Sequence, residues 1–538
     1  MRPEPLSTVR LFALAGLVSL SAFLWFFFRD EILLYGDAVA HINIARRVFD
    51  SMRPGILRLG TVWLPLPHLL MIPFVVGYHM WTSGWGASIP SMLAFVLGVV
   101  GIYKLLQPRV RPWPAILAAA IFGLNPNLLY LQSTAMTEPL FLATFIWALV
   151  YLDRFLSALG GRGEAPPKQS FAKSLEYCAI ALAASMLTRY DGWVYSAIFG
   201  SVVLVRWWMW RKTEPDAALR RRVTRSLIEF MLLCALVPAL WLAQNYALSG
   251  QPLDFMNGPY SAKAIEARSV QAGGPPHPGT GSLTVSTIFF LKAAKLNASG
   301  GYLEAPFFLI MVLGVSCAVR WFRSYGTLLL LLLPVPFYAY SIAYGSVPIF
   351  MPVWWPHSYY NVRYGIELLP AFAVFVALAF AFAGSRIRHL PVALGAQAAI
   401  LGIVAGSYSL VVAQTPISLR EARVNSITRI KLEDRLARVL RHTPPDSVIL
   451  METVNYVGAL QRAGIPLHRV IWEGAHTKWE ESLADPAKYA DYVVVFKGDE
   501  LWHATRLFPQ HLKLFAEFDS PDKPHVIVYE VERSGSKR

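Results

Sequence analysis

The chain has 538 residues, of which 55% are apolar and only 15% are charged, and its mean hydropathy is +0.43. Because soluble domains carry about 25% charged residues, this composition excludes a string of ordinary soluble domains. Runs of 18 or more residues without Asp, Glu, Lys or Arg lie at 11–28, 230–253, 324–356 and 390–419. Each is long enough to cross the ~30 Å hydrocarbon layer as a helix. The sequence therefore predicts a polytopic α-helical membrane protein.

The net charge of +15 is concentrated in one part of the chain. Residues 1–419 hold 31 Lys and Arg against 17 Asp and Glu, a net charge of +14, whereas residues 420–538 hold 18 and 17, a net charge of +1. The excess lies in short loops between apolar runs, where Lys and Arg set the orientation of a membrane protein. We therefore expect no nucleic-acid partner.

Eleven apolar segments predict membrane spans, near 11–28, 86–103, 113–131, 138–152, 174–188, 192–205, 228–248, 305–319, 325–343, 366–384 and 390–412. One further apolar segment, 63–80, contains Pro65, Pro67 and Pro73. Proline interrupts helices because it lacks a backbone donor and clashes with the preceding turn. We therefore interpret 63–80 as half-helices or a re-entrant element.

The distribution of Lys and Arg predicts the orientation. With the N-terminus inside, the inner segments carry 20 Lys and Arg in 75 residues, and the outer segments carry 11 in 111 residues. Positive charge concentrates in cytoplasmic loops, so we expect the N-terminus on the cytoplasmic side. The protein itself is expected in the inner or plasma membrane. Everything after the last span is expected outside. A full span at 63–80 would instead place the Arg-rich loop 206–229 outside.

The end of the chain changes character. Residues 419–441 have apolar positions at helical spacing. Short β-type runs follow at 447–451, 492–496 and 526–529, with helical-looking segments between them. We predict a membrane domain over 1–412 and a small soluble α/β domain over 413–538 on the outer face, where it is free to bind partners.

The first candidate for chemistry is Asp37, which follows Gly36 in the first outer loop. Ionisable residues at membrane depth or at its rim are functional candidates, and a carboxylate here is suited to act as a general base. His41 lies four residues on, so a helix brings both side chains to one face. The structural alternative is that Asp37 caps this helix.

Two further turns at the outer rim carry charge. Glu138 stands before Pro139, where a carboxylate is also typical of a simple helix start. Arg189 and Asp191 lie in a turn with Tyr and Trp neighbours, where they have the alternative of pairing with each other. These residues are candidates for the same site as Asp37.

Arg363 and Tyr364 enter the span 366–384 from outside, and Arg363 is the only Lys or Arg in the segment 344–363. The planar guanidinium is the preferred fork for phosphate. The alternative is that Arg363 extends towards lipid headgroups. Lys292 and Lys295 are weaker candidates of the same kind.

Several catalytic signatures are absent from the sequence, namely GxxxxGK[ST], HExxH, a CxxC pair and GxSxG. The chain therefore has no nucleotide-phosphate loop, zinc-protease motif or serine nucleophile elbow. A membrane enzyme without a nucleotide site must take an activated donor from the membrane itself.

An ordered set of short elements resembles the GT-C glycosyltransferases, specifically the protein O-mannosyltransferase and aminoarabinose-transferase group (family 39). These are Gly36-Asp37 before an amphipathic helix, Trp63-Leu64-Pro65-Leu66-Pro67, Thr137-Glu138-Pro139, and Arg363-Tyr364 with Pro370 downstream. The resemblance extends over essentially the whole chain, although each motif is short. It implies a GT-C-like fold of about eleven transmembrane helices.

The resemblance also implies a function, namely inverting transfer of a sugar from a polyprenyl-phosphate-linked donor on the outer face. Asp37 matches the family's catalytic acid position and would be the general base, with His41 and Glu138 as further catalytic residues. Arg363 matches a position near the lipid phosphate, and Tyr364, Arg189 and Lys292 would complete the phosphate site.

The sequence departs from the family at one place, because many members carry Asp-Glu where Asp37 is followed by Ala38. This leaves open whether the acceptor is a lipid, a glycan or a protein, and whether a divalent metal is needed; no metal ligand set is predicted. The paired acids and WWD-type motif of oligosaccharyltransferases are missing, which favours transfer of a single hexose or pentose.

Two other classes remain open. A transporter or flippase of a lipid-linked glycan would use the same basic residues without a base. Transporters often show internal repeats and broken spans at the midplane, whereas the ionisable residues of this chain cluster at one rim. A receptor or scaffold would use the domain at 413–538 for partners.

Overall fold

The computed structural model describes residues 7–159, 170–271, 273–475 and 477–532. The chain forms two compact units, each assembled from separate stretches of sequence. Unit 1 comprises Met1–Arg29, Thr61–Pro67 and Pro90–Glu421, and unit 2 comprises Asp30–Gly60, His68–Ile89 and Ala422–Arg538.

Unit 1 is helical. Its longer helices are α1 (Thr8–Phe27), α5 (Trp85–Leu106, which begins in unit 2), α6 (Pro112–Gly123), α7 (Pro126–Gln132), α8 (Glu138–Leu159), α9 (Ser170–Met186), α10 (Asp191–Arg211), α11 (Ala217–Ser249), α13 (Ala262–Gln271), α14 (Leu283–Ala298), α15 (Glu304–Arg320), α17 (Pro334–Tyr344), α18 (Leu369–Arg386) and α19 (Leu390–Ala413). Short helices join them: α12 (Asp254–Asn257), α16 (Phe322–Tyr325) and the 3-10 turns η2 (Gly301–Leu303), η3 (Gly326–Leu332) and η4 (Val362–Leu368).

Within the described residues, eight helices are long and apolar enough to cross a membrane, or nine if the bent pair α6 and α7 is one span. The bend of 59° lies at Asn125 and Pro126, where Asn125 accepts hydrogen bonds from the first amides of α7. Helices α9 and α10 occupy the two remaining predicted spans. The chain is therefore an integral multi-pass membrane protein, as its sequence predicts.

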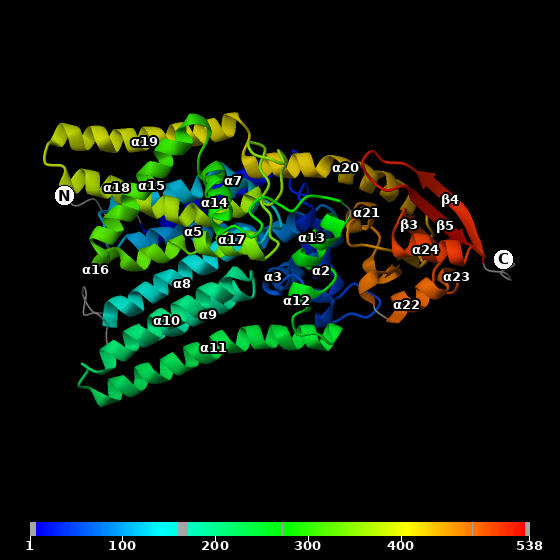
Figure 1. Cartoon of the computed structure of the whole chain (residues 1–538), viewed down its shortest axis with the longest axis horizontal. Helices are drawn as coiled ribbons and strands as arrows, with labels where there is room; N and C mark the ends of the chain where they lie inside the picture. Colours follow the sequence, from blue (N-terminus) through cyan, green and yellow to red (C-terminus); the bar gives the residue numbers. More distant parts are fainter. Residues whose placement is uncertain (1–6, 160–169, 272, 476, 533–538) are drawn as a thin grey trace. The chain divides into compact units, whose positions relative to one another are not determined.

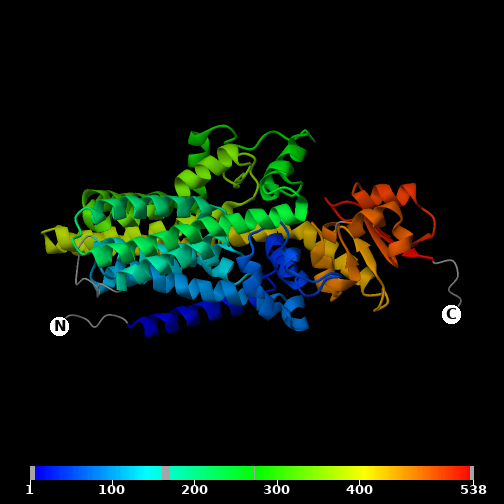
Figure 2. The same cartoon turned by 90° about the horizontal axis from the view of Figure 1, so that it is seen from below.

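The helices of unit 1 pack in two groups that Figure 1 separates. Helices α8, α9, α10 and α11 lie side by side, and α15, α18 and α19 form a second group. Helix α1, dark blue in Figure 2, lies at the edge of unit 1. It contacts α7 through Ser19, whose hydroxyl donates to Gln132 at 2.7 Å, and through the ring of Phe26 against Tyr130.

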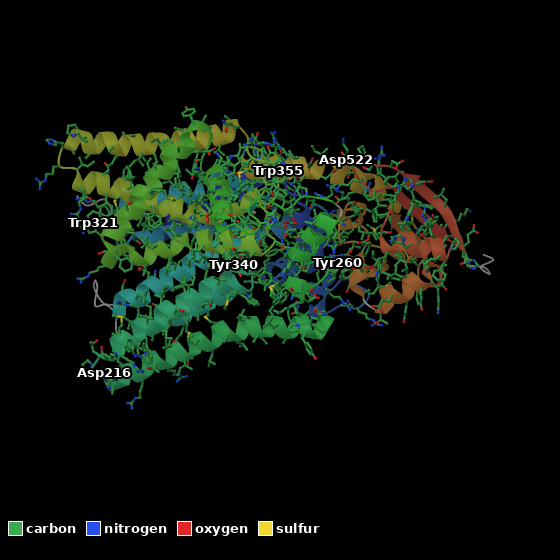
Figure 3. The ribbon with its side chains drawn as sticks, in the orientation of Figure 1. Asp216, Tyr260, Trp321, Tyr340, Trp355 and Asp522 are labelled. Carbon is green, nitrogen blue, oxygen red and sulfur yellow. The ribbon has the colours of Figure 1, made fainter. Side chains whose placement is uncertain are left out.

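The loops of unit 1 alternate between two ends of the bundle. Asp216 and Trp321, from two predicted inner loops, lie at one end in Figure 3, whereas Tyr260 and Trp355, from two predicted outer loops, lie towards the other. This is the arrangement that alternating spans require.

The proline-rich segment 63–80 contains two short helices, α3 (Leu66–Val75) and α4 (Tyr78–Thr82), rather than one span. The amide of Leu66 donates to the carbonyl oxygen of Leu187 at 3.0 Å, and the hydroxyl of Tyr190 donates to that of Val62 at 2.8 Å. These bonds hold the segment that precedes α3. The interpretation of 63–80 as interrupted half-helices is confirmed.

Unit 2 contains a five-stranded sheet with the order β2-β1-β3-β5-β4. The strands are β1 (Ile449–Met451), β2 (Val470–Ile471), β3 (Tyr492–Phe496), β4 (Leu512–Phe518) and β5 (Val526–Val531). Strands β2, β1 and β3 are parallel, and β5 and β4 are antiparallel additions. The three predicted β-type runs and the helical segments between them are confirmed, and β2 and β4 are two further strands that the sequence did not indicate.

The helices of unit 2 are α2 (Gly36–Arg47), η1 (Ile56–Leu59), α3 (whose first two residues belong to unit 1), α4, α20 (Ile417–Leu440, whose first turn belongs to unit 1), α21 (Val457–Ala463), η5 (Leu467–Arg469), η6 (Glu473–Ala475), α22 (Thr477–Ala484), α23 (Pro486–Tyr489) and α24 (Glu500–Leu507). Helix α20 confirms the helical spacing predicted over 419–441. The sheet core is apolar and includes Leu450, Val493 and Val495, all fully buried.

Candidate functional site

Most of the residues that the sequence singles out lie in or beside two groups of buried polar side chains, one group in each unit. In unit 1 they form an arginine–carboxylate cluster. Its members are Glu138, Arg189, Asp191, Arg363, Glu367 and Glu421.

Two glycines allow the backbone to approach closely enough to form this cluster. A Cβ on Gly192 would lie 2.7 Å from the carbonyl group of Ser185, so only glycine lets α10 turn back tightly after α9. A Cβ on Gly365 would lie 2.3 Å from the backbone of Ala293, so η4 packs directly on α14. The first contact positions Arg189 and Asp191, and the second positions Arg363 and Glu367.

Arg363 is buried, with 6% of its surface exposed, and it contacts two carboxylates. Its Nε donates to Glu138 Oε1 at 3.1 Å, and its Nη1 donates to Glu421 Oε1 at 2.9 Å. The backbone amide of Arg363 donates to the other oxygen of Glu421 at 3.2 Å. A guanidinium held inside the protein does not extend to lipid headgroups, so that alternative for Arg363 is wrong.

Arg189 joins the same cluster from the turn between α9 and α10. Its Nε lies 3.0 Å from Glu367 and 3.4 Å from Asp191, and its Nη1 lies 3.7 Å from Glu138. Burial alone lowers the pKa of Arg189, but the acidic groups around it raise the pKa well above its ordinary value. Arg189 therefore remains charged at every physiological pH.

Two tyrosines complete the cluster. The hydroxyl of Tyr338 donates to Glu367 at 2.7 Å and accepts from Arg189 at 2.8 Å. The ring of Tyr364 lies 4.8 Å from the guanidinium of Arg189 and 5.1 Å from that of Arg363. These cation–π contacts hold the two arginines in place on a common ring.

The cluster holds more acidic than basic groups. Four carboxyls (Glu138, Asp191, Glu367 and Glu421) meet two guanidinium groups, and Oε2 of both Glu138 and Glu367 is buried without a hydrogen-bond partner in the described structure. A buried acceptor without a partner is costly. The arrangement is therefore suited to an added hydrogen-bond donor, and an anion that reaches an arginine must displace a carboxylate.

Lys292 lies apart from these contacts, on α14. It forms an ion pair with Glu304, the first residue of α15. Glu138 is likewise the first residue of α8, but its carboxylate contacts the arginines of the cluster instead of its own helix amides. The simple helix-start interpretation of Glu138 therefore does not account for its side chain.

Asp37 lies in unit 2, in the first turn of α2, and is partly buried. The residue at the cap position is Tyr35, which makes no side-chain capping bond. The alternative that Asp37 is the helix cap is therefore wrong. Two arginines of α20 fix the segment before it: Arg429 donates to the carbonyl oxygens of Leu33 and Leu34, both at 3.0 Å, and Arg423 pairs with Glu31.

One turn beyond Asp37, His41 is buried against a histidine that the sequence analysis did not single out. Nδ1 of His41 and Nε2 of His68 lie 2.9 Å apart, and the two residues are 4% and 0% exposed. One ring must donate and the other accept, so the pair fixes a tautomer on each ring as long as neither is doubly protonated. The signal for His68 is weak in the sequence because it stands in the apolar segment 63–80.

No group of three or more His, Cys, Asp or Glu side chains placed to hold a metal ion is found over the described residues.

Acidic residues also follow the parallel strands of unit 2. Glu452 follows β1, Glu473 follows β2 and Asp499 follows β3, so all three lie at the carboxyl edge of the sheet. Burial, with the charges of Glu473, Asp499 and Glu500, raises the pKa of Glu452 to about 7. Burial raises the pKa of Asp499 to about 6.

Glu452→Gln is expected to stabilise unit 2 at pH 8 but not at pH 4. The pKa of Glu in an unfolded chain is ~4.3, so the folded state binds the proton of Glu452 more tightly than the unfolded state does. The free energy of unfolding of unit 2 therefore falls as the pH rises from ~4.3 through about 7. The variant removes this loss. Thermal unfolding of the full-length protein, followed by tryptophan fluorescence, should show a Tm raised by several degrees at pH 8. The exposed Glu480→Gln is the matched control, and equal Tm shifts in both variants, or none, would contradict the prediction.

Comparison with known proteins bears on the fold. The chain matches no protein-family model and no curated protein sequence. The crystal structure of ArnT from Cupriavidus metallidurans bound to undecaprenyl phosphate aligns over 97% of both chains, with a TM-score of 0.57 and 14% identity. The chain has a GT-C-like fold.

The apo structure of the same ArnT supports this fold, with a TM-score of 0.56, 13% identity, and coverage of 95% of this chain and 97% of ArnT. An oligosaccharyltransferase from Archaeoglobus fulgidus aligns more loosely, at a TM-score of 0.47 over 98% of this chain and 75% of its own. The two ArnT structures confirm the resemblance to GT-C proteins for the fold. The roles of the individual site residues stay predictions.

Proposed function

We propose that the protein is a membrane glycosyltransferase that uses a polyprenyl-phosphate-linked sugar. The observation that carries the proposal is the GT-C-like fold, which aligns along 97% of both chains with an ArnT structure bound to undecaprenyl phosphate. The buried arginine–carboxylate cluster supports it, because ionisable groups inside a membrane protein are rare unless they serve function.

Asp37 is the proposed general base. It lies in the first turn of a helix where it is not the cap, and the segment before it is held by Arg429. Removal of the acceptor's proton makes its oxygen or nitrogen a better nucleophile towards the sugar carbon. His41 is proposed to orient Asp37 or the acceptor. Its contact with His68 is proposed to hold the ring of His41 in a fixed position on α2.

Arg363 and Arg189, bridged by Tyr364, are the proposed ligands of the donor phosphate, with Lys292 as a further cation. Fixed cations in a low-dielectric site stabilise a departing phosphate more effectively than the same charges in water. In this structure Arg363 forms ion pairs with Glu138 and Glu421. Donor phosphate must therefore displace a carboxylate from Arg363, and Glu138, which contacts both arginines, is the proposed one, which gives Glu138 its proposed catalytic part.

We propose transfer of a single hexose or pentose, with inversion, to a lipid, glycan or protein acceptor. The test is turnover by the purified full-length protein in proteoliposomes, supplied with a panel of radiolabelled polyprenyl-phosphate sugars. Release of free polyprenyl phosphate together with labelled acceptor supports a transferase. Movement of intact donor across the bilayer without cleavage would show a flippase instead.

The reaction is proposed to occur on the outer face of an inner or plasma membrane, with the N-terminus in the cytoplasm. Cysteines introduced at two exposed positions, Asp522 and Thr213, test this in a background without Cys178, Cys234 and Cys317. In intact cells a membrane-impermeant maleimide is expected to label the Asp522→Cys variant. The Thr213→Cys variant should be labelled only after permeabilisation, and the reverse pattern would overturn the orientation.

A further inference from the structure

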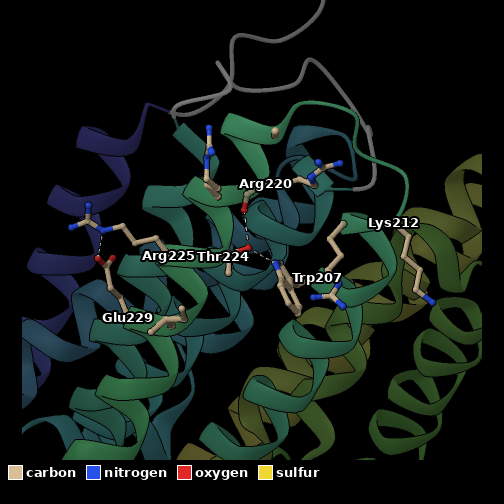
Figure 4. A pocket seen from close by; sticks show the side chains of 10 residues that line it. Trp207, Lys212, Arg220, Thr224, Arg225 and Glu229 are labelled. Carbon is tan, nitrogen blue, oxygen red and sulfur yellow. Dashed lines mark hydrogen bonds and ion pairs between the residues drawn. The ribbon is translucent and has the colours of Figure 1, made fainter.

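A basic cavity lies between α10 and α11, next to the α10–α11 turn (Figure 4). Its volume is about 720 Å³. Five of the described side chains that line it are basic (Arg211, Lys212, Arg220, Arg221 and Arg225), and the acidic one among them is Glu229. The lining therefore carries five positive charges and one negative, a net charge of +4.

The described residues neutralise little of this charge. Arg225 pairs with Glu229 at 2.8 Å, but the two side chains are 82% and 45% exposed, so the pair is weak. Arg220 donates to the carbonyl oxygen of Glu214 at 2.6 Å. Across the described residues, the basic side chains other than Arg225 that line the cavity have no carboxylate partner. The cavity is thus suited to an anion from outside the chain.

The indole ring of Trp207 lines the cavity together with these charges. The Nε1 of Trp207 donates to the hydroxyl of Thr224 at 3.2 Å, which ties α10 to α11. The guanidinium of Arg211 lies 4.5 Å from the ring of Trp207, and the ammonium of Lys212 lies 3.4 Å from that of Trp208. Cationic groups are therefore held over aromatic faces at the rim of the cavity, where Figure 4 shows Trp207 and Lys212.

The surface beyond the cavity is apolar and exposed. Along α11, Ile228, Leu232 and Leu236 are 54%, 64% and 51% exposed. Exposed apolar side chains on a spanning helix face lipid chains, and tryptophan is enriched where those chains meet the headgroups. The cavity therefore lies at headgroup depth, with a surface for acyl chains directly next to it.

We propose that this cavity binds the phosphate headgroup of an anionic phospholipid in the leaflet that the α10–α11 turn faces. Arginine forks bind phosphate oxygens in pairs, and the apolar surface of α11 takes the acyl chains. This apolar surface is the reason to assign the site to a lipid and not to a free phosphate. The proposal is independent of the sugar-transfer reaction.

Titration of the purified full-length protein with phosphatidylglycerol and with phosphatidylcholine, read by native mass spectrometry, tests the proposal. The cavity variant is Arg220→Gln with Arg221→Gln. The control, Arg206→Gln with Arg222→Gln, removes the same amount of charge from α10 and α11 at positions outside the cavity lining. A third variant with Lys at positions 220 and 221 retains the charge.

Wild type is expected to prefer phosphatidylglycerol, and the cavity variant should lose about 10-fold or more of that affinity, given the typical gain per basic residue near an anionic surface. The control and the Lys variant should lose much less. Three results would overturn the proposal: no preference between the two lipids, equal losses in the cavity variant and its control, or displacement of the lipid by millimolar inorganic phosphate.

Discussion

Asp37→Asn is expected to lower sugar transfer by ~10²–10⁴-fold, the usual loss when a general base is removed. Asparagine has nearly the same shape but cannot accept the acceptor's proton. The fold should tolerate the change, since Asp37 is not the cap of α2 and asparagine keeps the size of the side chain and an oxygen that accepts hydrogen bonds. Turnover of a polyprenyl-phosphate sugar by the purified variant is the measurement.

The matched control is Asp30→Asn in the same loop. Asp30 is exposed and has a positive φ of 56°, a conformation that asparagine also tolerates. Its turnover should equal that of wild type, and the Tm of both variants should stay close to wild type. If Asp37→Asn keeps more than about a tenth of the activity, a smaller loss than a general base allows, Asp37 is not the base.

Arg363→Met is expected both to destabilise unit 1 and to abolish donor binding. Glu138 and Glu421 are each 1% exposed and would lose the guanidinium charge between them. Removal of one partner of a buried ion pair typically costs about 3–5 kcal/mol. Loss of activity in this variant alone would therefore not distinguish a structural role from phosphate binding.

A second substitution separates the two roles. In Arg363→Met with Glu421→Gln, the charge of Glu421 is removed, and Glu138 keeps Arg189 at 3.7 Å. This double variant should regain much of the lost Tm yet still fail to bind or turn over donor. Arg363→Lys should retain part of the activity, because it keeps the charge but not the planar fork.

Donor affinity and Tm of the three variants, measured in detergent, decide between the roles. A double variant that recovers both stability and donor affinity would limit Arg363 to holding Glu138 and Glu421. The donor phosphate would then be expected at Arg189 or Lys292.

The secondary structure of the chain follows closely from local sequence. The apolar runs predict the long helices, because a span requires about 20 apolar residues wherever it lies in the fold. The spacing of Asp37 and His41 predicts α2. The prolines of the segment 63–80 predict that it forms short helices, which are α3 and α4. Strand β4 escaped prediction because it lies at the edge of the sheet, is partly exposed and carries an irregularity at Leu514 and Ala516. Strand β2 has only two residues, too few for any periodicity.

The sequence by itself determined the membrane class, the interrupted segment before α5, and the identity of most charged candidates, since each depends on hydropathy or on short spacing. Which of these charges meet was decided only by the tertiary structure. Arg363 is 225 residues from Glu138 and 58 from Glu421, and Glu367 stands at the entry of an apolar span, where local sequence does not reveal its contact with Arg189. The balance of four carboxyls against two arginines arises because Gly192 and Gly365 let separate helices pack within backbone contact. Periodicity carries no information about such packing, because it describes one element at a time.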